Sequence, residues 1–443
     1  MAEAKKESSL HHHPVEILQR LIQFDTTNPP GNESECIAFI DRLLTEVGIE
    51  TTVLSKAPNR SNLVARLSGR GDAPPLLLYG HVDVVTTKGQ DWQHPPFEGV
   101  LRNGYVWGRG ALDMKGGVAM MLVAFLRAKT ENLNLPGDVI LAVVSDEEAA
   151  GEFGAKFLVE EHPDLFDGVR YAIGEFGGFT FHIGNTCFYP IQIAEKQFCW
   201  MKATVHGPGG HGSVPVRGGA VARLAELLRR LDTRRLPVHI TPPARVMLRA
   251  MAASLSGASG LLPRLLMRPA LADIILRLLG ERGRIFDPLI HNSVSPTILQ
   301  GSDKINVIPG RVSVELDGRL LPGFQPEDLI TELRSIVGEE VDLDVVQYDP
   351  GPVETDMGLF ETLADVLRQA DPGGVPVPLL LSGVTDARFF SRLGIQSYGF
   401  TPMDLPEDFS FLDTIHAADE RIPVDALAFG TDAIYELLGR FGD

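Results

Sequence analysis

The sequence predicts a mixed-sheet α/β fold of two domains, one of them inserted into the other. With 443 residues, the chain exceeds what one ordinary hydrophobic core accommodates. Apolar, Val- and Ile-rich runs such as residues 137–146 alternate with helical patterns, which is typical of a sheet covered by helices on both faces. Near residue 197 this pattern is replaced by strands of alternating apolar and polar residues, and the first pattern returns after residue 350.

The larger predicted domain comprises residues 1–196 and 350–443. Apolar residues at helical spacing predict helices at 15–24 and 35–48, and glycines open a buried helix at 116–129. The apolar runs predict strands at 51–55, 62–67, 75–80 and 137–146. After residue 350, buried strands and helices are expected again at 376–383, 386–394 and 395–400.

The inserted domain is predicted to span residues 197–349 and to be of the α+β class. Residues 197–207 alternate like a half-exposed strand, and a helix is expected at 218–231. An acidic first turn marks a second helix at 326–338. The other predicted strands lie at 293–301, 305–310, 311–320 and 341–349.

An apolar, arginine-rich segment around residues 240–290 stands out in this domain. Between Asp232 and Asp273 the chain has six arginines and no acidic residue. The segment fits a pair of helices that pack on their own domain. It also fits a basic, apolar surface for a dimer partner or for a hydrophobic anionic substrate. An amphipathic membrane anchor is a third interpretation.

Charge and cysteine content narrow the range of partners. The net charge of -18 argues against nucleic acids and anionic membranes. No apolar run reaches the roughly 18 residues of a transmembrane helix, and the N-terminus lacks the apolar core of a signal peptide. The cysteines Cys36, Cys187 and Cys199 form neither a CxxC pair nor a disulfide framework. We therefore expect a cytoplasmic protein without membrane or nucleic-acid partners.

The first polar residues that could bind a metal or take part in catalysis follow the predicted strand "LLLYG". His81 and Asp83 are two apart, so on an extended chain their side chains face the same side. His81 could then ligate a metal while Asp83 fixes its tautomer from behind. A histidine at a strand end also occurs as a structural or surface residue, so partners are needed elsewhere in the chain.

Several carboxylates could be the partners of His81 in a metal site. Asp113, between glycines and before an apolar helix, could cap that helix or give one oxygen to each of two metals. Glu147 and Glu148 follow a buried strand, where acidic neighbours are costly without a cation, although a solvated turn explains them too. Glu175 ends another strand, and His416 lies on a loop near the C-terminus. Two histidines with carboxylates favour Zn²⁺, with Mn²⁺ or Co²⁺ as substitutes.

In this order, the motifs resemble those of the M20 family of metallopeptidases and amidohydrolases. The family includes acetylornithine deacetylase, succinyl-diaminopimelate desuccinylase, aminoacylase-1 and carboxypeptidases. The matching stretches run from Leu21 to His416 and include "GHVDVV", "WGRGALDMKGG", "SDEEAAGEFGA", "GEFGG", "HGSVP" and "TIHAADERI". Residues 292–323 look like those of aminoacylase-like and carboxypeptidase-S-like members. The resemblance implies an α/β metallohydrolase domain with an inserted α+β lid or dimerisation domain.

The resemblance also implies a role for each site residue. Asp113 would bridge two metal ions, with His81 and Glu175 completing one site and Glu148 and His416 the other. A further set would act around these metals: Asp83 orients His81, Glu147 is the general base, and the peptide between Asp113 and Met114 is cis.

In the inserted domain, the resemblance makes His211 the lid histidine that reaches the scissile carbonyl, often from the partner subunit of a homodimer. Asn306 and Arg319 resemble lid residues that contact substrate, and the fork of Arg319 suits a carboxylate. Gly383 lies in a stretch similar to the family's glycine-rich substrate loop, where Val384 replaces the usual second glycine.

The expected activity is therefore hydrolysis of the amide bond of an N-acyl amino acid or small peptide with a free carboxylate. Two divalent metal ions would serve as cofactors. The arginine-rich segment suggests a hydrophobic N-acyl group, and a dipeptidase or carboxypeptidase is the alternative. Another two-metal hydrolase, such as a phosphoesterase, and a non-catalytic binding protein on the same fold are the remaining rivals.

Overall fold

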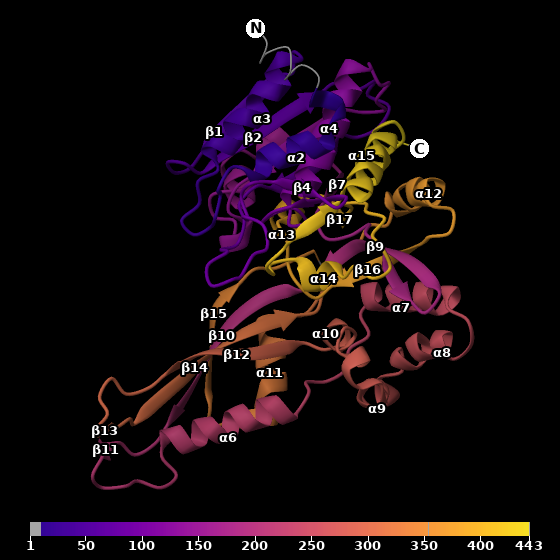
Figure 1. Cartoon of the computed structure of the whole chain (residues 1–443). Helices are drawn as coiled ribbons and strands as arrows, with labels where there is room; N and C mark the ends of the chain where they lie inside the picture. The colour runs from indigo at the N-terminus through magenta and orange to yellow at the C-terminus, as the bar shows by residue number, and fades with distance from the viewer. Residues whose placement is uncertain (1–9, 353, 443) are drawn as a thin grey trace. The chain divides into compact units, whose positions relative to one another are not determined.

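The structure, a computed structural model, describes residues 10–352 and 354–442, and the chain forms two compact units (Figure 1). Unit 1 holds the described residues up to 193, together with 356–379 and 385–442. Unit 2 holds the described residues from 194 to 355, together with 380–384. The ends of the larger predicted domain, at residues 1–9 and 443, lie outside the described residues, as does residue 353.

The large sheet has nine strands in the described part of the chain, in the order β1-β2-β6-β3-β7-β17-β9-β16, with β8 beside β9. Its centre is parallel: β3 runs parallel to β6 and β7, and β7 to β17. Antiparallel pairs such as β2 with β6 make the sheet mixed, which confirms the predicted α/β class. The strands are Thr51–Ser55 (β1), Ser61–Leu67 (β2), Leu76–His81 (β3), Val139–Val144 (β6), Tyr171–Gly174 (β7), Phe181–Ile183 (β8), Thr186–Glu195 (β9), Val375–Leu381 (β16) and Gln396–Gly399 (β17).

Helices cover both faces of the central strands, which is why β3 and β6 are buried along their whole length and apolar except for His81 at the end of β3. Alternate residues of β3 face opposite layers: the ring of Tyr79 lies 4.8 Å from that of Phe390, whereas Gly80 faces Met114 and Val118. Helix α4 packs against α2 and α15, and the three lie side by side (Figure 1). The helices of unit 1 are Pro14–Ile22 (α2), Ser34–Glu46 (α3), Lys115–Thr130 (α4), Ala155–Glu161 (α5), Phe360–Ala370 (α12), Ala387–Phe390 (α13), Phe411–Thr414 (α14) and Val424–Leu438 (α15).

A small antiparallel sheet, not predicted from the sequence, joins two distant segments of unit 1. Its strands are Val100–Arg102 (β4), Tyr105–Trp107 (β5) and Arg421–Pro423 (β18), in the order β18-β5-β4. Short 3₁₀ turns complete the unit at Leu10–His12 (η1), Glu147–Ala149 (η2), Pro163–Phe166 (η3) and Ser391–Leu393 (η5).

Unit 2 contains a four-stranded antiparallel sheet in the order β12-β14-β10-β15. Strand β10 is more buried than its half-exposed pattern predicts, because it lies between β14 and β15 and contacts α6. The elements are Gln197–His206 (β10), Gly210–His211 (β11), Ser293–Gln300 (β12), Val307–Ile308 (β13), Arg311–Leu320 (β14), Asp342–Tyr348 (β15), Ala220–Thr233 (α6) and Pro326–Val337 (α11).

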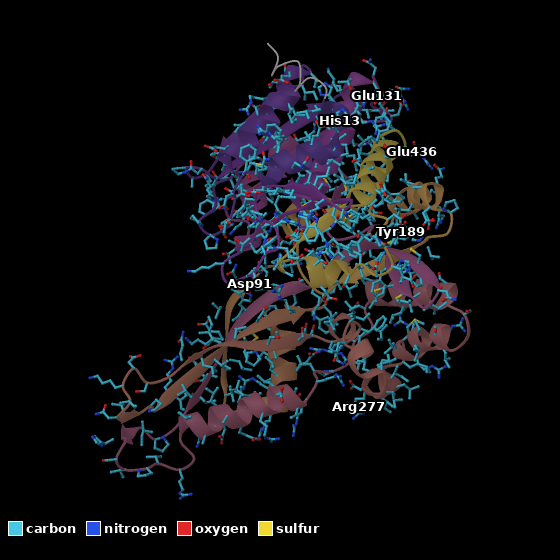
Figure 2. All side chains as sticks on the ribbon, in the orientation of Figure 1. His13, Asp91, Glu131, Tyr189, Arg277 and Glu436 are labelled. Carbon is cyan, nitrogen blue, oxygen red and sulfur yellow. The ribbon has the colours of Figure 1, made fainter. Side chains whose placement is uncertain are left out.

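The arginine-rich segment forms more than the expected pair of helices. Gly257, with a φ of +60°, and Pro269 at the start of α9 interrupt what would otherwise be longer helices. Arg277, labelled in Figure 2, lies on α9. In the described residues, no helix is both long and apolar enough to span a bilayer. The segment comprises Pro242–Ser254 (α7), Gly257–Leu266 (α8), Pro269–Leu279 (α9), Gly280–Gly283 (η4) and Asp287–Ile290 (α10).

Candidate metal centre

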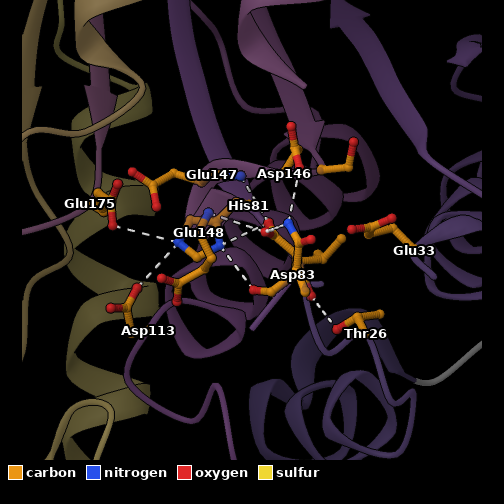
Figure 3. A network of polar contacts seen from close by, with 12 residues as sticks. Thr26, Glu33, His81, Asp83, Asp113, Asp146, Glu147, Glu148 and Glu175 are labelled. Carbon is orange, nitrogen blue, oxygen red and sulfur yellow. Dashed lines mark hydrogen bonds and ion pairs between the residues drawn. The ribbon is translucent and has the colours of Figure 1, made fainter. Parts of the chain in front are cut away.

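The candidate site lies where three parallel strands of unit 1 end. His81 is the last residue of β3, Glu175 directly follows β7, and Glu147 and Glu148 lie in η2 just after β6. Because parallel strands present their carboxyl ends at one edge, these side chains converge (Figure 3). The sheet thus gathers residues that are far apart in sequence.

The five predicted ligands form two overlapping groups. His81, Asp113 and Glu175 make one group, and Asp113, Glu148 and His416 make the other. Within each group, one candidate ligand atom per residue lies within 4.8 Å of the others. The Nε2 atom of His81 lies 3.2 Å from Asp113 Oδ1, and the Nε2 atom of His416 lies 3.1 Å from Asp113 Oδ2. Asp113 therefore presents one oxygen to each histidine, and it is shared by both groups.

The donor chemistry of these groups fits divalent cations. Burial raises the pKa of Glu148 to about 7, and it also raises the pKa of Glu175. Among the described residues, the ion-pair partners of Asp113, Glu148 and Glu175 are the histidines His81 and His416, and none is a lysine or arginine. Carboxylates are costly to bury without a positive partner, and nitrogen and oxygen ligands in sets of this size suit Zn²⁺. Each group therefore offers what one divalent cation requires.

Asp83 supports the site in two ways. The Nδ1 atom of His81 lies 3.0 Å from the backbone oxygen of Asp83 and 3.4 Å from its carboxylate. The same carboxylate accepts hydrogen bonds from the backbone N–H groups of Glu147 and Glu148, each at 3.2 Å. Burial opposes the charged form, but the hydrogen bonds from His81 and Asn28 lower the pKa of Asp83 below its usual value. Asp83 therefore also fixes the turn that carries both glutamates.

Glu147 lies beside the ligand groups without belonging to either (Figure 3). Burial, assisted by the nearby carboxylate of Glu175, raises the pKa of Glu147 well above its usual value. A carboxylate with a raised pKa is a better proton acceptor than an ordinary surface glutamate. The peptide bond between Asp113 and Met114 is cis, as the family resemblance implied.

A buried ionic network behind this turn was not predicted from the sequence. The guanidinium of Arg60 lies 2.6 Å from Asp146 and 3.0 Å from Glu33. Asn28 donates to both Asp83 and Asp146, at 2.8 and 3.0 Å, so the network continues to the ligand-bearing turn. Burial raises the pKa of Glu33 to about 7. Arg60 stands in a polar loop, "APNRSN", where nothing in the sequence separates it from a surface arginine.

Replacing Arg60 by Met is expected to reduce the free energy of unfolding by roughly 3–5 kcal/mol, because the change leaves buried carboxylates without their cation. Chemical denaturation after removal of bound cations measures this loss without a contribution from altered metal binding. The control is Arg70→Met, since Arg70 pairs with Asp72 on the surface, where side-chain exposures are 45% and 64%. A loss of about 0–1 kcal/mol is expected there. Equal losses in the two variants would contradict a structural role for the buried network.

The remaining predicted residues lie in unit 2. His211, on β11, is exposed, and its Nδ1 atom lies 2.7 Å from the hydroxyl of Ser213. The backbone oxygen of Asn306 accepts a hydrogen bond from the N–H of Gly212 at 2.8 Å, which places these two predicted lid segments next to each other. The fork of Arg319 is engaged with Asp317, at 2.9 and 3.1 Å. Gly383 follows β16, in the part of the loop that belongs to unit 2.

Comparisons with known sequences agree on one family. The model of peptidase family M20/M25/M40 matches residues 77–440. A probable carboxypeptidase S-like protein of Dictyostelium discoideum is 28% identical, over 82% of this chain and 71% of that protein. The N-fatty-acyl-amino acid synthase/hydrolase of Homo sapiens is 27% identical, over 82% and 73%. The aminoacylase-1 of Sus scrofa is 25% identical, over 98% and 97%.

Solved structures show the same fold at low sequence identity. An M20 family metallo-carboxypeptidase from Sulfolobus solfataricus is 16% identical and gives a TM-score of 0.70, with 97% of this chain and 99% of that chain covered. Human carnosine dipeptidase 1, also 16% identical, gives 0.68 over 99% and 98%.

Proposed function

This chain belongs to peptidase family M20/M25/M40, and from that premise we propose that it hydrolyses the amide bond of N-acyl amino acids with a long, apolar acyl chain. The observation that carries the proposal is the pair of ligand groups sharing Asp113, with Glu147 beside them. A site of this composition suits amide hydrolysis by an activated water molecule.

Each ligand group would hold one divalent cation, which we propose to be Zn²⁺, with Co²⁺ or Mn²⁺ able to replace it. His81, Asp113 and Glu175 would bind the first cation, and Asp113, Glu148 and His416 the second. When bound, the two cations would lower the pKa of a water molecule and polarise the carbonyl oxygen of the substrate. Asp83 would keep His81 in the tautomer that presents Nε2.

Proton transfer would fall to Glu147. Its carboxylate would accept the proton of the attacking water and then donate it to the leaving nitrogen. His211 would donate a hydrogen bond to the oxyanion, either from the same chain or from the partner in a homodimer formed through unit 2. Asn306, Arg319 and Gly383 would contact the substrate, and Arg319 would have to leave Asp317 to bind its carboxylate.

Two observations support a long acyl chain. Relatives of this chain in several vertebrates carry the name N-fatty-acyl-amino acid synthase/hydrolase. The segment 242–290 of unit 2 also exposes large apolar side chains among its arginines, including Leu261 at 52%, Ile274 at 47% and Leu278 at 78%. The carboxypeptidase-S-like relative favours a second candidate, hydrolysis of a small peptide at its C-terminal bond.

A substrate panel distinguishes the two candidates. The purified, Zn²⁺-loaded protein is given N-acyl phenylalanines with acyl chains from acetyl to oleoyl, together with dipeptides that end in phenylalanine. We expect kcat/KM to rise with chain length by up to about fourfold per methylene, because each buried methylene stabilises binding by about 0.8 kcal/mol. The matched control is each N-acyl phenylalanine amide, which lacks the carboxylate and should react more slowly. Preference for the acetyl compound or for the dipeptides would contradict the long-chain proposal.

A further inference from the structure

Two segments about 300 residues apart meet beside the ligand groups of unit 1. Strand β5 pairs with β18, and just beyond this pair the N–H of Gly108 donates to the backbone oxygen of Glu420 at 2.9 Å. Asp113 lies a few residues after Gly108, and His416 lies a few residues before Glu420. Each segment therefore carries one candidate ligand close to the same anchoring point.

The carboxylate of Glu420 is fully buried and accepts four hydrogen bonds. Its Oε1 atom accepts from the backbone N–H groups of Leu112 and Asp113, at 2.8 and 3.1 Å. Its Oε2 atom accepts from the N–H of Gly110 at 3.1 Å and from Nη1 of Arg109 at 2.6 Å. Since three of the four donors are backbone groups of residues 110–113, Glu420 fixes the path of the chain that carries Asp113.

Arg109, equally buried, extends this contact to the other segment. Its Nη2 atom donates to the backbone oxygen of His416 at 3.1 Å and to Oε1 of Gln90 at 2.7 Å. Gln90 in turn donates to the same oxygen of His416 at 2.7 Å. His416 has a φ of +60°, an uncommon conformation for a residue with a side chain, and these two donors hold its carbonyl in place.

We infer that Arg109 and Glu420 are positioning residues, which set the separation of Asp113 and His416 and so preform the cation site of Asp113, Glu148 and His416. The inference rests on the proposed function. His416 needs such support because its side chain is 47% exposed and stands on a loop. His81 and Glu175, in contrast, extend from adjacent strands of the buried sheet.

This difference predicts an asymmetric effect on the two cations. In Glu420→Gln, an amide NH₂ takes the place of one acceptor oxygen. The buried N–H donors that faced this oxygen then have no acceptor. Arg109→Lys keeps the positive charge but loses the fork that reaches Glu420 and His416 together. In both variants we expect the cation of Asp113, Glu148 and His416 to bind about 10–100-fold more weakly, as is typical when a partner behind a ligand is lost. The other cation should keep nearly its wild-type affinity in Arg109→Lys and lose less affinity than the first in Glu420→Gln, because Asp113 belongs to both groups.

Equilibrium dialysis with Zn²⁺ under chelator control measures both dissociation constants, and the visible absorption of the Co²⁺-substituted protein reports the geometry of each site. The matched control is Arg127→Lys, because Arg127 also pairs with a carboxylate, that of Asp432, at 2.6 Å and stacks 4.1 Å from the ring of Tyr435. Arg127 contacts neither ligand-bearing segment, so this control should bind both cations like the wild type.

Wild-type dissociation constants for both cations in folded Glu420→Gln and Arg109→Lys would overturn the inference. If either variant fails to fold, Gln90→Leu gives the decisive measurement, since it removes one donor to the His416 carbonyl from a half-buried position. The same change removes the acceptor that orients Nη2 of Arg109 toward that carbonyl, so both donors are disturbed. Selective weakening of one cation there supports the inference, and unchanged binding overturns it. Binding of fewer than two cations by the wild-type protein would instead overturn the proposed function, so the two failures are distinguishable.

Discussion

Glu147→Gln is expected to lose turnover by about 10³-fold or more while the protein keeps both cations. The amide is isosteric with the carboxylate but does not accept a proton at neutral pH, and general acid–base groups typically contribute 10²–10⁴-fold. Glu147 belongs to neither ligand group, and its contact with Asp83 is made by its backbone N–H. The substitution therefore leaves cation binding and the local fold intact. Metal analysis and kcat, measured on the same preparation, check both parts of the prediction.

The neighbouring residue provides the matched control. Glu148→Gln is the same chemical change one position along the chain, but Glu148 belongs to the ligand group with Asp113 and His416. This control should lose one cation as well as turnover. If Glu147→Gln turned over substrate at the wild-type rate, another group would have to accept the proton. If it lost a cation, Glu147 would be a ligand.

Most of the candidate ligands could be predicted from the sequence because they lie at the ends of recognisable strands. His81, Glu148 and Glu175 each follow an apolar run that reads as a buried strand, and the order of parallel strands then places them together. His416 has no such signal, and only the family resemblance connected it to Asp113. The structure brings all five residues together, and their roles remain predictions until metal is measured.

The residues that hold these ligands in place could not be predicted from the sequence. Arg60 and Glu420 are charged residues in polar stretches, Arg109 stands between two glycines, and a charged residue in either setting is usually exposed. What buries them is the meeting of segments far apart in the chain. A single sequence does not reveal such a meeting, because neither segment alone shows what neutralises its charge.

The same reason limits the prediction of the fold. Long apolar elements such as β3, β6 and α4 follow directly from their patterns. Strands β4, β5 and β18 have three residues each, too few to show a period, and β18 forms only because a partner more than 300 residues away supplies its hydrogen bonds. The strand predicted at 305–310 shrinks in the same way to the two residues of β13.

Asp113→Ala is expected to cost both cations at once. Asp113 is the one residue common to the two ligand groups, and each of its oxygens faces a different histidine. With alanine, each group falls to one histidine and one glutamate, so neither retains the three protein ligands typical of catalytic zinc. Turnover should fall by at least the roughly 10³-fold expected for Glu147→Gln. Circular dichroism should show a folded protein, because the backbone N–H of residue 113 keeps its bond to Glu420.

Substitutions of residues that belong to only one ligand group should give a different metal content from Asp113→Ala. Glu175→Ala and His416→Ala should each remove one cation and leave the other, whereas Asp113→Ala should remove two. The metal content of dialysed samples at micromolar Zn²⁺ distinguishes these outcomes. If Asp113→Ala kept one cation at wild-type affinity, Asp113 would serve a single group, and the remaining group would have to be completed by a carboxylate now assigned elsewhere. Glu147, beside Glu175, is one candidate, so that result would also put its assignment as the base in question. The two substitutions thus test one another: the ligand set is complete without Glu147 only if Asp113 is shared.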